Sequence, residues 1–280
     1  MVASGQPSAG EGALGNLPLS GADLRCLQDW FTRYVRSFDT ADPILQGELL
    51  LKEQHCHRVS EEIKTLGEQL DLGGDALRIA EAMGLLHDIG RFEQVTRYRT
   101  FVDGKSENHA ELGLKVLHRG KTLAALAEGT AELITRAILY HNRLHLPEGE
   151  SPGCLFYSRL LRDADKLDIL ALFATYYHDE GARSAAVELN LPDRPDISAE
   201  VLEALRQGRT VNMQDLKCLN DFKLLQLGWV YDVNFLPTLA ALSNRGHLKK
   251  VREALPASAE IDQLYDRLWS HMEGLLQARG

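Results

Sequence analysis

Six ionisable side chains occur where the helical spacing of the sequence places apolar residues. They are four histidines and two aspartates: His55, His87, Asp88, His109, His141 and Asp165. His87 follows Ile79, Ala80 and Met83 at helical spacing, and Asp88 is its neighbour. Any one of them alone would be explained more simply as a hydrogen-bonded core residue. Burying the whole set unpaired would cost several kcal/mol for each charge, and a divalent cation removes that cost. The set therefore predicts a metal site.

His57 is not included in this set, although it lies only two residues after His55. Two residues correspond to a rotation of about 200° around a helix. The face that carries His57 also carries Glu61 and Lys64. We therefore expect His57 to be exposed to solvent.

The elements that must position these residues are predicted to be helices. Apolar residues recur at helical spacing over residues 43–70, 75–87, 106–119, 129–142, 153–180, 215–231, 235–244 and 260–277. Ser20 is typical of the N-cap of one further helix. Residues 91–105 have mixed polarity and no helical stripe, so they are predicted to form a loop. No strand alternation of useful length occurs, and the chain is expected to be all-α.

Composition excludes several classes of partner. The 280 residues are 44% hydrophobic and carry a formal net charge of −9, which argues against a nucleic acid as the main partner. No apolar run approaches the roughly 20 residues that span a bilayer, so no membrane association is expected. The N-terminus lacks the features of a secretory signal, and the four cysteines show no metal-binding or disulfide spacing. These observations predict a cytoplasmic protein and leave its oligomeric state open.

The order of the candidate ligands resembles the HD-domain superfamily of metal-dependent phosphohydrolases. Three segments carry the resemblance: His55-Cys56-His57-Arg58-Val59 is similar to the H-x-x-R-V opening of the family, LLHDIGRF to its LLHDIGK/R segment and LLRDADKLDIL to its closing run. The resemblance covers about residues 45–180. It implies an HD-domain helical bundle, here with additional C-terminal helices.

Composition and the resemblance together predict the domain organisation. Residues 1–19, rich in Gly, Ala, Ser and Pro, are predicted to be a mobile tail. Residues 20–180 are expected to form the metal-binding HD-domain core. Residues 181–280 carry no recognised motif and are expected to form a helical extension that packs on the core and shapes substrate choice.

The family contains members with one metal ion and members with two. One-metal members use positions that correspond to His55, His87, Asp88 and Asp165, and two-metal members add two histidines that His109 and His141 match. We favour a binuclear site bridged by Asp88. The alternative is a single ion, with the two added histidines binding substrate. The imidazole and carboxylate ligands suit Mn, Fe, Co, Ni or Zn, with Mg as a further choice.

The activity that the resemblance implies is hydrolysis of a phosphate ester by a metal-bound hydroxide. The protein would be a phosphomonoesterase or phosphodiesterase whose substrate is a small phosphorylated molecule or nucleotide. Three residues are expected to be catalytic. Asp88 would be the bridging ligand, and Arg91 would bind the phosphate group of the substrate as a clamp. Lys166, next to Asp165, would neutralise negative charge around the ligands or on the substrate. An ordinary surface ion pair is the alternative for Arg91.

The sequence departs from one subgroup of the family. Members that cleave cyclic dinucleotides carry an H-H-E…G-Y-P stretch, whereas this chain has His141-Asn142-Arg143. Hydrolysis of cyclic di-GMP is therefore not expected. Two functions from other classes stay open, a di-iron HD-domain oxygenase and a nucleotide-binding regulatory module that does not turn its ligand over.

Overall fold

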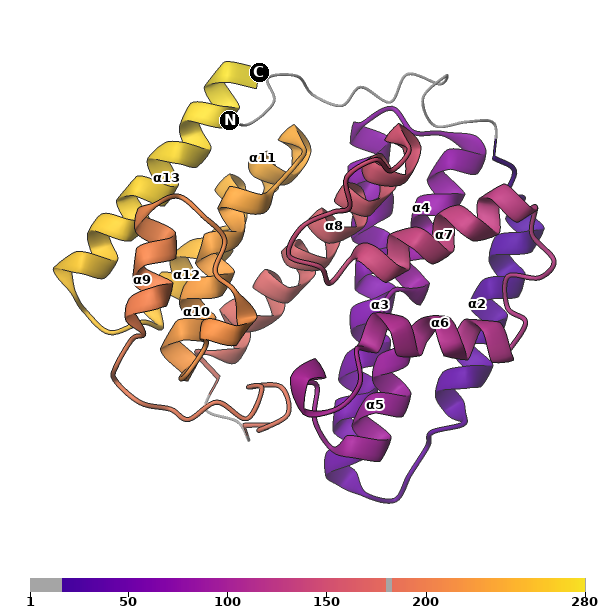
Figure 1. The fold of residues 1–280 in the computed structure, drawn as a ribbon, viewed down its shortest axis with the longest axis horizontal. Helices are drawn as coiled ribbons and strands as arrows, with labels where there is room; N and C mark the ends of the chain where they lie inside the picture. Colours follow the sequence, from indigo (N-terminus) through magenta and orange to yellow (C-terminus); the bar gives the residue numbers. More distant parts are fainter. Residues whose placement is uncertain (1–16, 180–182, 280) are drawn as a thin grey trace. The chain divides into compact units, whose positions relative to one another are not determined.

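The computed structural model describes residues 17–179 and 183–279, which form helices and no strand (Figure 1). The all-α prediction is therefore confirmed. Contacts divide the chain into two compact units, and the division falls between Asp165 and Lys166 within one helix. The expected tail lies outside the described residues except for residues 17–19. No helix in the described part of the chain is long and apolar enough to cross a membrane.

The N-terminal unit carries the segments that the sequence analysis singled out. Its elements are α2 (Gly21–Arg36), α3 (Pro43–Gln69), α4 (Gly74–Leu86), α5 (Gly90–Tyr98), η1 (Asp103–Lys105), α6 (His109–Arg119), α7 (Glu128–Tyr140) and the first part of α8 (Pro152–Tyr176). Helix α3 packs closely against α4. The packed faces bury Val59, Ile63, Ile79 and Met83, so the apolar stripes of the sequence become the core of this unit.

Local sequence signals fix where the first two helices begin. The Ser20 hydroxyl accepts a hydrogen bond from the main-chain N–H of Asp23, and the Asp23 carboxylate accepts one in return, which forms a capping box. The Asp42 carboxylate caps α3, whose first residue is Pro43. These two starts agree with the predicted ones.

Residues 90–98 form helix α5, so the prediction of a loop over residues 91–105 is wrong for its first part. Phe92 and Val95 are fully buried, but so is the amide of Gln94, and Glu93 is largely buried. Two buried polar residues between the apolar ones hid the helical stripe. The segment that follows α5 does contain the expected irregular backbone, interrupted by η1.

A glycine allows α5 and α6 to approach each other closely. A Cβ atom at Gly90 would overlap the carbonyl oxygen of His109 and the main-chain nitrogen of Gly113. Only a residue without a side chain fits there. The turn after His87-Asp88 therefore brings the first residue of α6 next to the end of α4.

The C-terminal unit begins with the second part of α8. It continues through α9 (Ala199–Arg206), η2 (Met213–Asp215), α10 (Leu219–Gly228), η3 (Trp229–Asp232), α11 (Leu236–Asn244), α12 (His247–Glu253) and α13 (Ala259–Arg279). Asp221 is buried here and accepts hydrogen bonds from the N–H and hydroxyl of Ser198 and from the N–H groups of Lys217 and Cys218. These contacts make Asp221 a structural residue. The predicted packing of residues 181–280 on the core stays a prediction.

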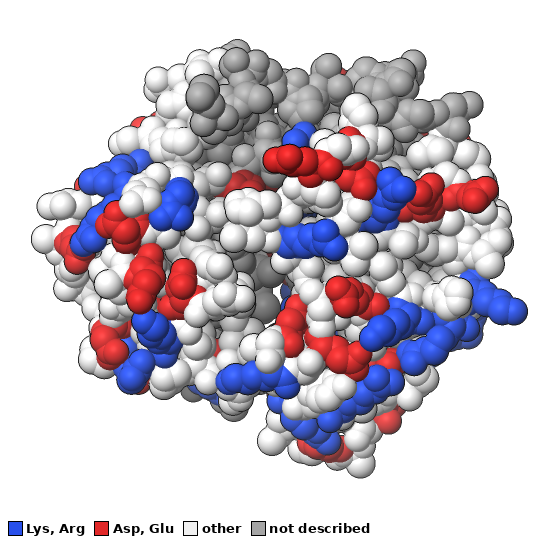
Figure 2. Space-filling model, viewed as in Figure 1, with Lys and Arg blue, Asp and Glu red and all other residues white. Residues whose placement is uncertain are grey.

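Charged side chains on the face shown in Figure 2 lie interspersed, Lys and Arg beside Asp and Glu. Ion pairs of the N-terminal unit include Lys115–Glu107 at 2.9 Å and Arg99–Asp42 at 2.6 Å. Exposed pairs of this kind contribute little to stability. The charges of the next section are buried, so their interactions are screened less by solvent.

Candidate metal centre

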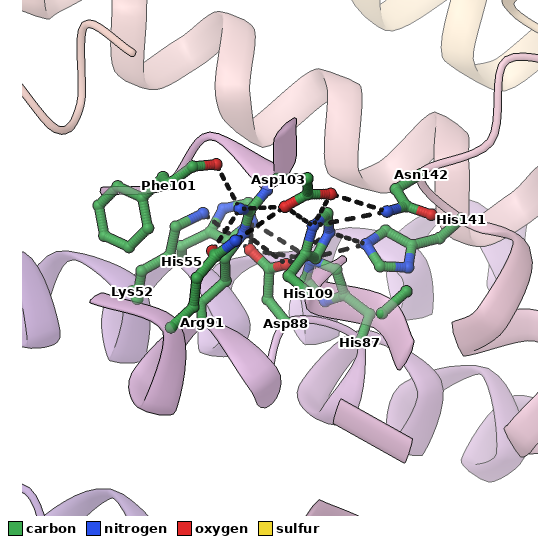
Figure 3. Close-up of polar contacts among 12 residues, drawn as sticks. Lys52, His55, His87, Asp88, Arg91, Phe101, Asp103, His109, His141 and Asn142 are labelled. Carbon is green, nitrogen blue, oxygen red and sulfur yellow. Dashed lines mark hydrogen bonds and ion pairs between the residues drawn. The ribbon is translucent and has the colours of Figure 1, made fainter. Parts of the chain in front are cut away.

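All six predicted ligands meet in the N-terminal unit, although they come from five helices and one turn. His55 lies within α3, His87 directly follows α4, Asp88 lies in the turn before α5, His109 is the first residue of α6, His141 directly follows α7 and Asp165 lies on α8. Helix ends and two mid-helix positions, His55 and Asp165, thus converge on one cluster (Figure 3). The four histidines and Asp88 are buried, and the Asp165 side chain is 18% exposed.

Asp88 directs its two carboxylate oxygens toward different pairs of histidines. Its Oδ2 lies 3.5 Å from Nε2 of His55 and 3.8 Å from Nε2 of His87. Its Oδ1 lies 3.4 Å from Nε2 of His109 and 3.7 Å from Nε2 of His141. We call the group around Oδ2 the first half-site and the group around Oδ1 the second half-site.

Asp165 completes the first half-site. Its Oδ1 lies 3.2 Å from Nε2 of His55 and 3.6 Å from Nε2 of His87. This oxygen is buried and meets no hydrogen-bond donor in suitable geometry among the described residues. A buried carboxylate oxygen in that condition is costly unless a cation compensates it. The side chains of His55, His87 and Asp165 thus form one group that could hold a metal ion.

The hydrogen bonds of three histidines leave their Nε2 lone pairs facing the cluster. Nδ1 of His87 lies 2.8 Å from the carbonyl oxygen of Gly84, and Nδ1 of His141 lies 2.6 Å from that of Ile138. Because these oxygens only accept hydrogen bonds, each Nδ1 carries the proton. Nδ1 of His109 carries its proton for the same reason, because it lies 2.7 Å from a carboxylate oxygen of Asp103. Metal-binding histidines are characteristically oriented by such a contact at the opposite ring nitrogen.

The spacing of the inward nitrogens fits shared coordination. Nε2 of His109 lies 3.0 Å from Nε2 of His141, and Nε2 of His55 lies 3.3 Å from Nε2 of His87. Ligand atoms about 2.1 Å from one ion lie roughly 3.0 to 3.4 Å apart in octahedral or tetrahedral geometry. Neither His109 nor His141 has a proton on Nε2, so the lone pairs of these two nitrogens face each other. A cation between them would be coordinated by both. The donor set therefore fits one or more divalent ions.

The electrostatics of the cluster keep the carboxylates ionised and His109 neutral. Burial acts to raise the pKa of Asp88, but Lys52, His87 and Arg91 outweigh it and hold that pKa well below its ordinary value. Burial likewise opposes ionisation of Asp165, and the adjacent imidazoles of His55 and His87 hold the pKa of Asp165 well below the usual range. Burial lowers the pKa of His109 to about 4. These are the protonation states that a metal ion requires of its ligands.

Asp103 contacts one of the candidate ligands, and the sequence did not single it out. Its carboxylate lies 2.7 Å from Nδ1 of His109 and accepts hydrogen bonds from Nη1 of Arg91 at 3.1 Å, Nε2 of Gln94 at 2.9 Å and Nδ2 of Asn142 at 3.2 Å. Figure 3 shows it above His109, on the side of the ring away from Asp88. Asp103 therefore orients His109. Its sequence context, Val-Asp-Gly-Lys, resembles an ordinary turn.

Arg91 lies beside the cluster, as its place after the His87-Asp88 turn predicts. Its Nη1 donates to the carbonyl oxygen of Phe101 at 2.6 Å and to Oε1 of Gln94 at 2.7 Å, and its Nε lies 3.5 Å from Oδ1 of Asp88. No acceptor for Nη2 occurs among the described residues. The guanidinium is thus fixed at one nitrogen and has donors left at the other. Its role as a phosphate clamp stays a prediction.

Lys52 is a second cation at the cluster, and sequence reasoning missed it too. Its Nζ donates a hydrogen bond to Oδ2 of Asp88 at 2.7 Å. It precedes His55 by three residues on α3, so both project from the same side of the helix. This spacing is the signal that could have identified it. The residues that follow it, Glu53 and Gln54, resemble a solvated helix face, which concealed it.

Lys166, the third predicted catalytic residue, belongs to the C-terminal unit. Its ammonium donates hydrogen bonds to the Asp232 carboxylate at 2.5 Å and to the Asp232 carbonyl oxygen at 2.9 Å. Its catalytic role stays a prediction. His57, which the sequence analysis left out of the ligand set, is exposed as expected, and its ring packs edge-on against Phe31.

Arg162 supports the backbone around His141. It is buried on α8, one turn before Asp165, and its Nη1 donates to the carbonyl oxygens of His141, at 3.2 Å, and of Arg143. These contacts close the turn that follows α7. Helix α8 thereby contributes a ligand to one half-site and holds the main chain of the other.

Comparison with known proteins gave one match. Residues 53–170 match the family model described as HD domain, and this segment includes all six candidate ligands. No curated protein and no solved structure gave a significant match to the chain.

Proposed function

Because residues 53–170 match the HD-domain family model, we propose that the protein is a metal-dependent phosphohydrolase acting on a small phosphorylated molecule or nucleotide. The observation that carries the proposal is the arrangement around Asp88, whose two oxygens each face a pair of imidazole nitrogens within 3.8 Å. A carboxylate between two such pairs is suited to bridge two ions. The proposal is therefore a binuclear centre.

Each ion would be held by a different half-site. His55, His87 and Asp165 would hold one ion with Oδ2 of Asp88. His109 and His141 would hold the other with Oδ1 of Asp88. When bound, divalent ions lower the pKa of a coordinated water toward ~7 and polarise a phosphoryl oxygen. The ligand types do not select among Mn, Fe, Co, Ni, Zn and Mg.

The protein's own residues orient the ester and support the ligands. Nη2 of Arg91 donates to a phosphoryl oxygen, because Nη1 is already bonded to Phe101 and Gln94. Asp103 holds the ring of His109 so that Nε2 faces Asp88. Lys166 remains in the proposal as a charge next to Asp165, and its support is its position in the sequence alone.

Elemental analysis of the purified protein, followed by a phosphatase screen with the metal it contains, tests the proposal. We expect bound divalent metal and hydrolysis of at least one phosphomonoester, phosphodiester or nucleotide. Metal-loaded protein that hydrolyses none of these would contradict it. Bound iron with substrate-dependent oxygen consumption would favour the oxygenase alternative, and nucleotide binding without turnover would favour the regulatory module.

A further inference from the structure

Two cations and one aromatic ring form a group at the edge of the cluster. The Lys52 ammonium lies 5.4 Å from the centre of the Phe101 ring, and the Arg91 guanidinium lies 5.8 Å from it. Both side chains are 14% exposed. In Figure 3, Lys52, Arg91 and Phe101 lie together at one side of the ligands, and Asn142 lies at the opposite side. We call these three residues the cationic group.

Phe101 holds the two cations in place. Its ring face attracts the ammonium and the guanidinium, and its carbonyl oxygen accepts a hydrogen bond from Nη1 of Arg91 at 2.6 Å. In this position Lys52 contacts Oδ2 of Asp88, and Arg91 lies near Oδ1 of the same carboxylate. The positive charge is thus fixed at both half-sites.

Neutralising Asp88 does not account for Lys52 in the metal-loaded protein. Bound ions would compensate the Asp88 carboxylate, and Lys52 would then add an unbalanced positive charge 2.7 Å from Oδ2. A lysine ammonium has three N–H donors. Only one has an acceptor among the described residues, namely Oδ2 of Asp88. Two donors and a positive charge remain for an anionic ligand.

The charges of the group indicate which anion fits. The side chains in contact at the cluster carry three negative charges, on Asp88, Asp103 and Asp165, and two positive charges, on Lys52 and Arg91. Two divalent ions bring the net charge to +3. A hydroxide and a phosphomonoester dianion cancel it, whereas a hydroxide and a phosphodiester, which has one negative charge, leave +1. A terminal phosphate group is close to doubly charged at pH 7.

We propose that Lys52 binds the terminal phosphate group of the substrate and, with Arg91, makes the centre select a phosphomonoester over a phosphodiester. This inference rests on the proposed phosphohydrolase function and narrows it. In the reaction, the oxygen of water forms a bond to phosphorus and the P–O ester bond breaks. The alcohol oxygen keeps that electron pair and takes a proton from the water, so the products are an alcohol and inorganic phosphate.

The test compares four metal-loaded proteins: the wild type, Lys52→Gln, Lys52→Arg and the control Lys64→Gln. Lys64 lies on the same helix, twelve residues further on, and outside the cluster. Calorimetry measures the binding of inorganic phosphate, elemental analysis measures metal content, and kinetics give kcat/KM for p-nitrophenyl phosphate and bis(p-nitrophenyl) phosphate. The calorimetric readout does not depend on turnover.

We expect Lys52→Gln to bind inorganic phosphate about tenfold or more weakly at unchanged metal content, since hydrogen bonds to charged groups have that magnitude. Its preference for the monoester over the diester should fall by a similar factor. Lys52→Arg should retain most of both properties, and Lys64→Gln should match the wild type.

Three outcomes would overturn the inference. The first is binding of phosphate by Lys52→Gln as tightly as by the wild type, and the second is an equal loss of both ester activities. The third is a loss of metal in Lys52→Gln that Lys52→Arg does not restore, because the lysine would then act only by orienting the Asp88 carboxylate. If the wild type hydrolyses no phosphate ester or nucleotide in the phosphatase screen, the proposed function fails, and the calorimetry still decides whether Lys52 binds phosphate.

Discussion

The two half-sites differ in the anchor of one imidazole, since His109 of the second half-site contacts a side chain, whereas His87 of the first and His141 of the second contact main-chain carbonyl oxygens. In the first half-site, Nδ1 of His87 contacts the carbonyl oxygen of Gly84, one turn earlier on its own helix. In the second half-site, Nδ1 of His109 contacts the carboxylate of Asp103, which lies on the separate turn η1 and whose side chain is 29% exposed. A main-chain anchor persists as long as its helix does. A side-chain anchor can rotate away, so we expect the second half-site to bind its ion more weakly.

The largest effect is expected where the half-sites meet. Asp88→Ala removes the carboxylate whose two oxygens face the two half-sites, so both ions should be lost. Activity should fall by more than the roughly 100-fold that loss of a supporting residue costs. Elemental analysis and the phosphatase assay measure this, with the exposed His57→Ala as the control that keeps metal and activity. An Asp88→Ala protein that retains its full metal content would show that the carboxylate is not shared.

Replacing one histidine in each half-site separates two ions from one. His109→Ala should reduce the metal content from two ions per chain to about one, because the first half-site keeps all its ligands. His55→Ala should weaken the first half-site instead. Metal titration followed by elemental analysis measures both. If His109→Ala contains as much metal as the wild type, the single-ion alternative is favoured.

Asp103→Asn tests the side-chain anchor itself. It should weaken binding of the more weakly held ion roughly 10- to 100-fold and affect the other ion less, because loss of an orienting carboxylate has that effect on the affinity of its own half-site. Competition with a chelator measures both affinities. Glu107→Gln is the matched control, since Glu107 is partly exposed and pairs with Lys115 rather than with a ligand. Equal weakening of both ions would contradict the difference between the half-sites.

The close approach of α5 and α6 can be disrupted without removing a ligand. Gly90→Ala should lower the free energy of unfolding by about 1–3 kcal/mol, because the added methyl group overlaps the main chain at His109 and Gly113. Urea denaturation in the presence of a chelator measures it. Gly47→Ala on α3 is the opposite control. A Cβ there meets no atom within 4 Å, so stability should rise by up to about 1 kcal/mol.

A further effect, confined to the second half-site, concerns pH in the metal-free protein. Burial lowers the pKa of His109 from 6.5 to about 4 in the folded state, so between these values the unfolded chain binds more protons. The free energy of unfolding should therefore fall as the pH falls from 6.5 toward 4. The His109 contribution to this loss between pH 7 and pH 5 is about 2 kcal/mol. Denaturation at both values should show a smaller loss in His109→Gln, and equal losses would contradict this assignment.

The sequence predicted the histidines better than the residues that support them. His55, His87 and His141 stand out because an imidazole on an apolar helical stripe is unusual wherever the helix packs. Lys52 and Asp103 occur in surroundings typical of a solvated helix and a turn. Their roles arise only when α3, η1 and α6 come together, and no local spacing reports that.

The same limit explains the error over residues 91–105. Gln94 is fully buried because its amide donates to Asp103, to Ser106 and to the carbonyl oxygen of Glu107. A polar residue satisfied by a distant segment looks exposed in the sequence. Helix α5 was therefore not predicted, whereas α3 and α4, which bury apolar residues, were.

Helix α8 has a consequence for how the two ions would affect each other. It carries Asp165 in the first half-site, and one turn earlier Arg162 holds the carbonyl oxygen of His141 in the second. If α8 moves when one ion binds, the main chain at His141 in the second half-site moves with it. Occupancy of the half-sites should therefore be thermodynamically coupled, so that filling one changes the affinity of the other by a reciprocal factor.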